Sequence, residues 1–146
     1  MLSDYFKDAI LNHILKNVAI SDIGDASGLP ASATAGNLYI SFHTGNPVAG
    51  DQSTSEATYG GYARKSINRG SDWTVSSGEG YNATVQTFDT CTSGSNTITH
   101  VGIGTALSGA GTILFVYALG GDSFVVSTGI IPSFDIAQLS IAASCP

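Results

Sequence analysis

The amino-acid sequence predicts a mainly β fold, an antiparallel β-sandwich or a jelly-roll-like barrel that carries one N-terminal amphipathic helix. Three observations lead to this prediction. From residue 37 onward, apolar and polar residues alternate in short runs, as they do in half-buried strands. Clusters of Gly, Ser, Asn and Asp separate most of these runs. A helical spacing of apolar residues occurs in a single segment near the N-terminus.

That segment comprises residues 3–18, and either Ser3 or Asp4 can cap its start. Its apolar residues recur at three- and four-residue spacing, and they are Phe6, Ile10, Leu11, Ile14, Leu15 and Val18. The apolar face either packs on the protein's own β domain or docks on a neighbouring subunit, and the sequence leaves both alternatives open.

Residues 21–36 follow the helix and are rich in Gly, Ala, Ser and Pro, a composition typical of a flexible connector. The predicted domain organisation is therefore an arm over residues 1–36, made of the helix and this connector. A compact β domain is predicted over residues 37–146.

The first strand is predicted at Leu38–His43, where alternation ends at the turn residues Thr44–Pro47. Eight or nine short strands without intervening helices favour two antiparallel sheets or a barrel over a parallel α/β sheet. The run Ile113–Leu119 lacks alternation, so it is predicted to lie in the middle of a sheet with both faces covered. The further strands are expected at residues 61–67, 73–76, 82–88, 97–103, 112–119, 124–127, 130–134 and 139–142.

Composition excludes several classes of protein. The chain has 146 residues, enough for one domain, and only 11% of them are charged. Its longest apolar run, Ile113–Leu119, is far shorter than the roughly 20 residues of a membrane-spanning helix. We expect no export signal, because Asp4 and Asp8 interrupt the first apolar residues. An excess of 11 acidic over 5 basic residues argues against nucleic acid as a partner.

The two cysteines, Cys91 and Cys145, are too far apart for a CxxC motif. Free thiols are favoured over a disulfide between them, although the sequence leaves the pairing open.

The sequence offers little support for catalysis. It contains neither a Gly-x-Ser-x-Gly elbow nor a His-Glu-x-x-His motif, and with two glutamates it shows no obvious carboxylate pair. His43 and His100 are expected to be structural, and the glycines at 102, 104, 109 and 111 to form turns or bulges. We therefore predict no enzyme, no catalytic residue, no metal and no cofactor. A polysaccharide hydrolase using one of these histidines is the alternative from another functional class.

Arg64, Lys65 and Arg69 form one basic cluster in an otherwise acidic chain. Arg64 could make bidentate bonds to an acidic surface of a partner or of another copy. Alternatively, it could form an internal salt bridge to an aspartate.

Three motifs carry a resemblance to a known family. They are His43-Thr44-x-x-Pro47 at the end of the first strand, Gly61-Tyr62-Ala63-Arg64 after Glu56, and Thr99-His100-Val101-Gly102-Ile103. In this order the chain resembles small tailed-bacteriophage virion proteins over about residues 37–141. Members of that family are often labelled tail fibre proteins, and similar compact β proteins decorate phage heads.

The resemblance implies a virion structural protein. Because the sequence has none of the repeats that build long shafts, we expect a capsid decoration (cement) protein that binds outside the head and bridges major capsid subunits. The alternative is a tail fibre or tail-tip knob that takes part in host recognition. The expected partners are the major capsid protein and further copies of the chain, as a dimer or trimer, with no nucleic acid and no membrane. The expected location is the capsid surface of the virion, after assembly in the host cytoplasm. The residues predicted to bind partners are Phe6, Ile10, Ile14, Arg64, Lys65 and Arg69.

Overall fold

The computed structural model describes residues 1–21, 23–24 and 28–143, which divide into two compact units. Unit 1 comprises the described parts of Met1–Asn37, Asn68–Val85 and Phe134–Pro146. Unit 2 comprises Leu38–Ile67 and Gln86–Ser133. The predicted fold class is confirmed: the protein is mainly β, its sheets are antiparallel and one α-helix lies at the N-terminus. No sheet in the described ranges closes into a barrel.

Unit 1 begins with the predicted helix, α1 (Asp4–Lys16). The Ser3 hydroxyl caps it by accepting a hydrogen bond from the Phe6 backbone N–H at 3.3 Å. Asn17 ends it in the left-handed conformation, with φ of 55°, a conformation that asparagine tolerates better than most residues. Within the described ranges, no helix has the length and apolar character needed to cross a membrane.

The apolar face of α1 contacts a hairpin of the same unit. The hairpin consists of β3 (Trp73–Ser76) and β4 (Glu79–Asn82), and β11 (Ser140–Ala142) pairs with the other edge of β4. Leu11 and Leu15 are fully buried. A Cβ atom at Gly80 would lie 2.3 Å from Leu15 Cδ1, so the glycine allows the helix to approach the strand closely.

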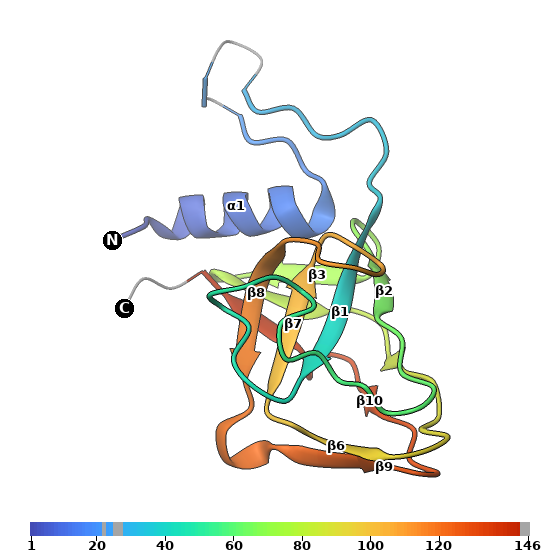
Figure 1. The fold of residues 1–146 in the computed structure, drawn as a ribbon. Coiled ribbons are helices and arrows are strands. Elements are labelled where there is room, and N and C mark those ends of the chain that lie inside the picture. Colours follow the sequence, from blue (N-terminus) through green and yellow to red (C-terminus); the bar gives the residue numbers. More distant parts are fainter. Residues whose placement is uncertain (22, 25–27, 144–146) are drawn as a thin grey trace. The chain divides into compact units, whose positions relative to one another are not determined.

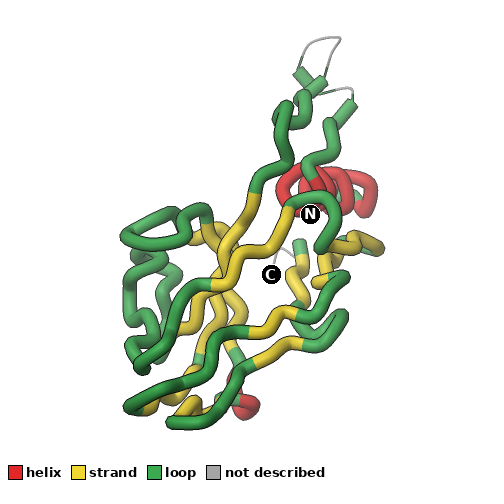
Figure 2. The backbone as a smooth tube through the Cα atoms, turned by 90° about the vertical axis from the view of Figure 1, so that its right-hand side faces the viewer, coloured by secondary structure: helices red, strands yellow, loops and turns green. Residues whose placement is uncertain are grey.

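The segment between α1 and β1 turns back on itself, and Figure 2 shows its two ends running side by side as loops. Ile20 and Leu29 exchange two backbone hydrogen bonds of 3.0 and 2.9 Å. Asn17 holds Ser32 through a further pair of side-chain bonds of 2.8 and 2.9 Å. Part of the predicted flexible connector, residues 22 and 25–27, lies outside the described residues.

Unit 2 contains a four-stranded antiparallel sheet (Figure 1). Its strand order is β2 (Lys65–Asn68), β1 (Asn37–His43), β7 (His100–Gly104) and β8 (Ile113–Ala118). Two shorter pairs join β6 (Ser95–Ile98) to β9 (Phe124–Ser127) and β5 (Gln86–Thr87) to β10 (Ser133–Phe134). A 3-10 turn, η1 (Gly120–Asp122), precedes β9.

The apolar core of unit 2 forms on one face of this sheet. Phe42 on β1 lies opposite Val101 on β7, and both are buried. The Phe42 ring stacks on Phe88, with centroids 4.1 Å apart, and meets Phe124 edge-on at 5.6 Å. The sheet therefore packs against the segments that contain β5 and β9, as two layers of one unit.

Three predictions about the strands are wrong. Residues 82–88 were expected as one strand, but β4 ends at Asn82 and β5 covers only Gln86–Thr87. The run Ile113–Leu119 was expected in the middle of a sheet, but its strand β8 is the outermost one, and Leu114 and Tyr117 are 40% and 45% exposed. Its continuous apolar pattern therefore does not reflect burial on both faces. Residues 97–103 were expected as one strand, but Thr99 interrupts them: β6 pairs with β9, whereas β7 pairs with β1 and β8.

Candidate functional site

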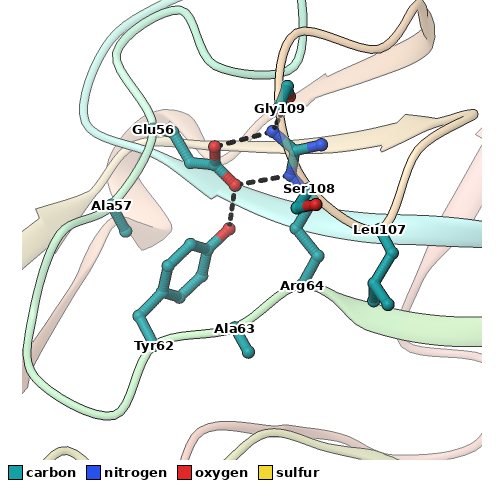
Figure 3. A pocket seen from close by; sticks show the side chains of 8 residues that line it. All are labelled: Glu56, Ala57, Tyr62, Ala63, Arg64, Leu107, Ser108 and Gly109. Atoms are coloured by element: carbon teal, nitrogen blue, oxygen red, sulfur yellow. Dashed lines mark hydrogen bonds and ion pairs between the residues drawn. The ribbon is translucent and has the colours of Figure 1, made fainter.

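A pocket of about 450 Å³ in unit 2 is built around an ion pair between Arg64 and Glu56 (Figure 3). Arg64 Nε lies 2.6 Å from Glu56 Oε1, and its Nη2 lies 2.7 Å from Oε2, so the two planar groups bond side by side. The Tyr62 hydroxyl donates to Glu56 at 2.9 Å and accepts from the Phe42 backbone N–H at 3.1 Å. Leu107, 58% exposed, forms part of the pocket's rim.

Arg64 also joins the pocket to the loop before β8. Its Nη1 donates to the Ala106 carbonyl at 2.9 Å, and its Nη2 donates to the Gly109 carbonyl at 2.7 Å. The side chain is only 2% exposed, so these bonds are shielded from water. One arginine thus fixes two loops that lie more than 40 positions apart in the sequence.

The electrostatics of the cluster fix the protonation states of Arg64 and Tyr62. The bond to Glu56 raises the pKa of Arg64 despite the opposing effect of burial. Burial raises the pKa of Tyr62 far above its usual range, and the nearby Glu56 carboxylate raises it further. Tyr62 is therefore a neutral hydrogen-bond donor and Arg64 a permanent cation, and neither changes its protonation state near neutral pH.

Elsewhere in unit 2, His43 and Ser41 form a second polar pair that is fully buried. His43 Nδ1 lies 2.9 Å from the Thr54 carbonyl and Nε2 lies 2.8 Å from Ser41 Oγ. Because a carbonyl only accepts, Nδ1 carries the proton. In the neutral histidine Nε2 then accepts from the Ser41 hydroxyl, which also lies 3.4 Å from the Gly102 carbonyl. Burial lowers the pKa of His43, which favours this neutral form. A serine donating to a histidine resembles a nucleophile and its base, but both side chains are 0% exposed, out of reach of a substrate.

A glycine at the end of β7 and another in the loop after it leave room for a buried glutamine side chain. Gln52 is fully buried, and its side-chain oxygen accepts from the Ala106 backbone N–H at 2.8 Å. Its own backbone N–H donates to the Ala110 carbonyl at 2.8 Å. A Cβ atom at Gly104 or Gly111 would lie 2.1 or 2.4 Å from Gln52 atoms. These glycines therefore make room for the Gln52 side chain.

Of the predicted basic cluster, Arg64 and Lys65 belong to unit 2 and Arg69 belongs to unit 1. Arg64 is paired with Glu56 inside unit 2, so the internal ion pair exists, with a glutamate instead of the expected aspartate. Arg69 belongs to unit 1, where it donates to the carbonyls of His13, Ile14 and Ala35. Lys65 is half-buried on β2. Arg69 thus satisfies the carbonyls at the C-terminal end of α1.

The three apolar residues proposed to bind a partner, Phe6, Ile10 and Ile14, are each half-buried on α1. The fully buried residues of the helix are Leu11 and Leu15, which the same periodic pattern contains. Leu11 and Leu15 therefore pack within unit 1, as expected if the helix packs on its own chain.

Sequence reasoning missed Gln52 and the role of Glu56. A signal for Glu56 was present, because it is one of only two glutamates and precedes Arg64 by eight residues in a sparsely charged chain. Gln52 lies in a polar turn and carries no such signal. Among the described residues, no group of three or more His, Cys, Asp or Glu side chains is placed to hold a metal. Cys91 is a buried free thiol, and Cys145 lies outside the described residues.

Comparison with known families identifies the protein's relatives. The family model described as "Podophage GP4 fiber I protein gp80" matches residues 1–142. The chain belongs to this family. It is therefore a phage virion structural protein, and the resemblance read from its motifs is confirmed. A search of curated proteins found no match. The family description names a fibre, which favours the fibre alternative over the capsid cement role.

Proposed function

We propose that the protein is a compact component of a phage tail fibre that takes part in attachment to the host. The observation that carries this proposal is the match of the fibre family over residues 1–142. The match includes α1 and both units, so the proposal concerns this whole stretch of chain and not one motif.

The short elements of the chain suit a knob or a joint better than a shaft. The longest helix has 13 residues and so spans only about 20 Å. Each strand of the sheet in unit 2 has seven residues or fewer. The length of a fibre would then come from other chains or from stacked copies.

The polar cluster around Arg64 fits a structural role within such a component. Arg64, Glu56 and Tyr62 bond to one another, and Arg64 also donates to the carbonyls of the loop before β8. Gln52 bonds to the same loop by accepting from the Ala106 backbone N–H. Such a network fixes the loops that precede β8 and border the pocket. Loops held by a rigid scaffold are where binding surfaces commonly lie, so rigidity here supports recognition of a host surface.

Removal of the gene from the phage distinguishes this role from that of a cement protein. We expect particles without the protein to adsorb poorly to host cells and to retain DNA on heating as well as wild-type particles do. Supplying the wild-type protein from a plasmid in the host should restore adsorption. Normal adsorption together with release of DNA at a lower temperature would contradict the fibre role and indicate a cement protein.

A further inference from the structure

β8 presents an unusual surface because it is an outermost strand with an apolar sequence. Natural proteins commonly protect such edges with charges, prolines or bulges. No Lys, Arg, Asp or Glu occurs between Asp89 and Asp122. The irregularity in the β7–β8 pairing lies at the start of β8, which leaves Phe115–Ala118 regular.

The backbone of this regular part has groups free to pair with another strand. The Leu119 N–H donates to the Thr99 carbonyl at 2.9 Å, so position 119 faces β7. In an antiparallel pair the groups of alternate residues point the other way. The N–H and C=O groups of Val116 and Ala118 therefore point away from β7, toward the open edge.

The core layer of unit 2 also continues onto this edge without being covered. Val101 and Ile103 on β7 are 1% and 2% exposed. Their direct neighbours on β8, Tyr117 and Phe115, share that face of the sheet, yet Tyr117 is 45% exposed and Phe115 is half-buried. A further strand beside β8 would extend the sheet and complete the layer.

We propose that the open edge of β8 pairs with the same edge of a second copy of this chain. The uncharged sequence favours this occupant, because in an antiparallel pair of identical strands any charge would face its own copy or a close neighbour. β8 carries no charged residue. The outward N–H and C=O groups of Val116 and Ala118 in one copy can bond to the outward C=O and N–H groups of β8 in the other. This inference does not depend on the fibre role, since self-association can be measured on the purified chain.

Sedimentation analysis of the purified full-length protein over a dilution series tests the proposal. The wild type should associate beyond the 14.9 kDa of one chain. Tyr117→Lys, which places a charge on the edge, should weaken association at least tenfold. Val116→Pro should do the same by removing an outward N–H while keeping the bonds to β7. The matched control is Ile136→Lys, at a 62% exposed apolar residue of unit 1, which should leave association unchanged.

Hydrogen exchange on the wild type provides a readout that does not need a variant to fold. The amides of Val116 and Ala118 should be protected at high protein concentration and should exchange faster on dilution. A wild type that stays at the mass of one chain, association unaffected by Tyr117→Lys, or unprotected amides at these two positions in the assembly would each overturn the proposal. Equal weakening by Ile136→Lys would overturn it as well.

Discussion

The two arginines of the Arg64–Arg69 segment illustrate how differently the two units are stabilised. In unit 2, Arg64 is buried and makes a bidentate ion pair with Glu56. In unit 1, Arg69 bonds to backbone carbonyls near the end of α1, while Leu11 and Leu15 provide the buried apolar contacts. Unit 2 therefore adds a buried charged network to its apolar core, whereas unit 1 combines apolar packing with capping of its helix. Substitutions in each unit should reveal this difference.

The largest effect is expected for Arg64→Met in unit 2. The substitution leaves the Glu56 carboxylate without its partner and should lower the free energy of unfolding by about 3–5 kcal/mol. Arg64→Lys is the matched control, because it keeps the charge and should lose less. Chemical denaturation measures both. A loss below about 1 kcal/mol for Arg64→Met would show that the ion pair contributes as little as an exposed one.

In unit 1, Leu15→Ala should cost about 2–5 kcal/mol, because it removes a fully buried side chain between α1 and β4. Val18→Ala, at a residue that is 46% exposed, is the control and should have a small effect. Gly80→Ala alone should also destabilise, since its Cβ meets Leu15. Its cost should fall in the Leu15→Ala background, and equal costs in both backgrounds would show that α1 does not pack closely there.

Arg69→Met should have a smaller effect, about 2 kcal/mol, because Arg69 bonds to neutral carbonyls and no buried charge is left behind. The loss should appear as faster amide exchange in the last turn of α1. If the amides of unit 2 were affected as strongly as those of the helix, the division of roles between the two arginines would be wrong.

The smallest effect concerns pH and His43. Burial lowers the pKa of His43 below its ordinary value of 6.5, so the unfolded chain binds this proton before the folded one does. The free energy of unfolding should therefore fall as the pH drops below about 6.5, by at most about 1.4 kcal/mol per pH unit. Denaturation between pH 7.5 and pH 5.5 should show a shallower dependence in His43→Gln. Identical slopes for both proteins would contradict a neutral, buried His43.

Local features of the fold could be predicted from the sequence. The helix and its Ser3 cap follow from contacts within one turn, and strand β1 follows from the alternation at residues 38–43. Strand order could not be predicted in this way. Ile113–Leu119 is apolar enough for a central strand. It lies at the sheet edge because its strand β8 pairs only with β7, whose other neighbour is β1.

The polar site shows the same limit. The sequence singles out Arg64 as one of few cations. That Glu56 is its partner depends on the path of the loop between the two residues, which the sequence pattern does not reveal. Gln52 carries no sequence signal, because its burial depends on room left by Gly104 and Gly111 across the unit. Burial of polar groups is therefore the part of the site that needs the tertiary structure.

The number of copies per virion tests the proposed fibre role most directly. Quantitative mass spectrometry of purified particles would compare peptides of this chain with those of the major capsid protein. The fibre role predicts a small number of copies per particle, located at the tail when the protein is labelled in micrographs. Hundreds of copies distributed over the head would contradict it.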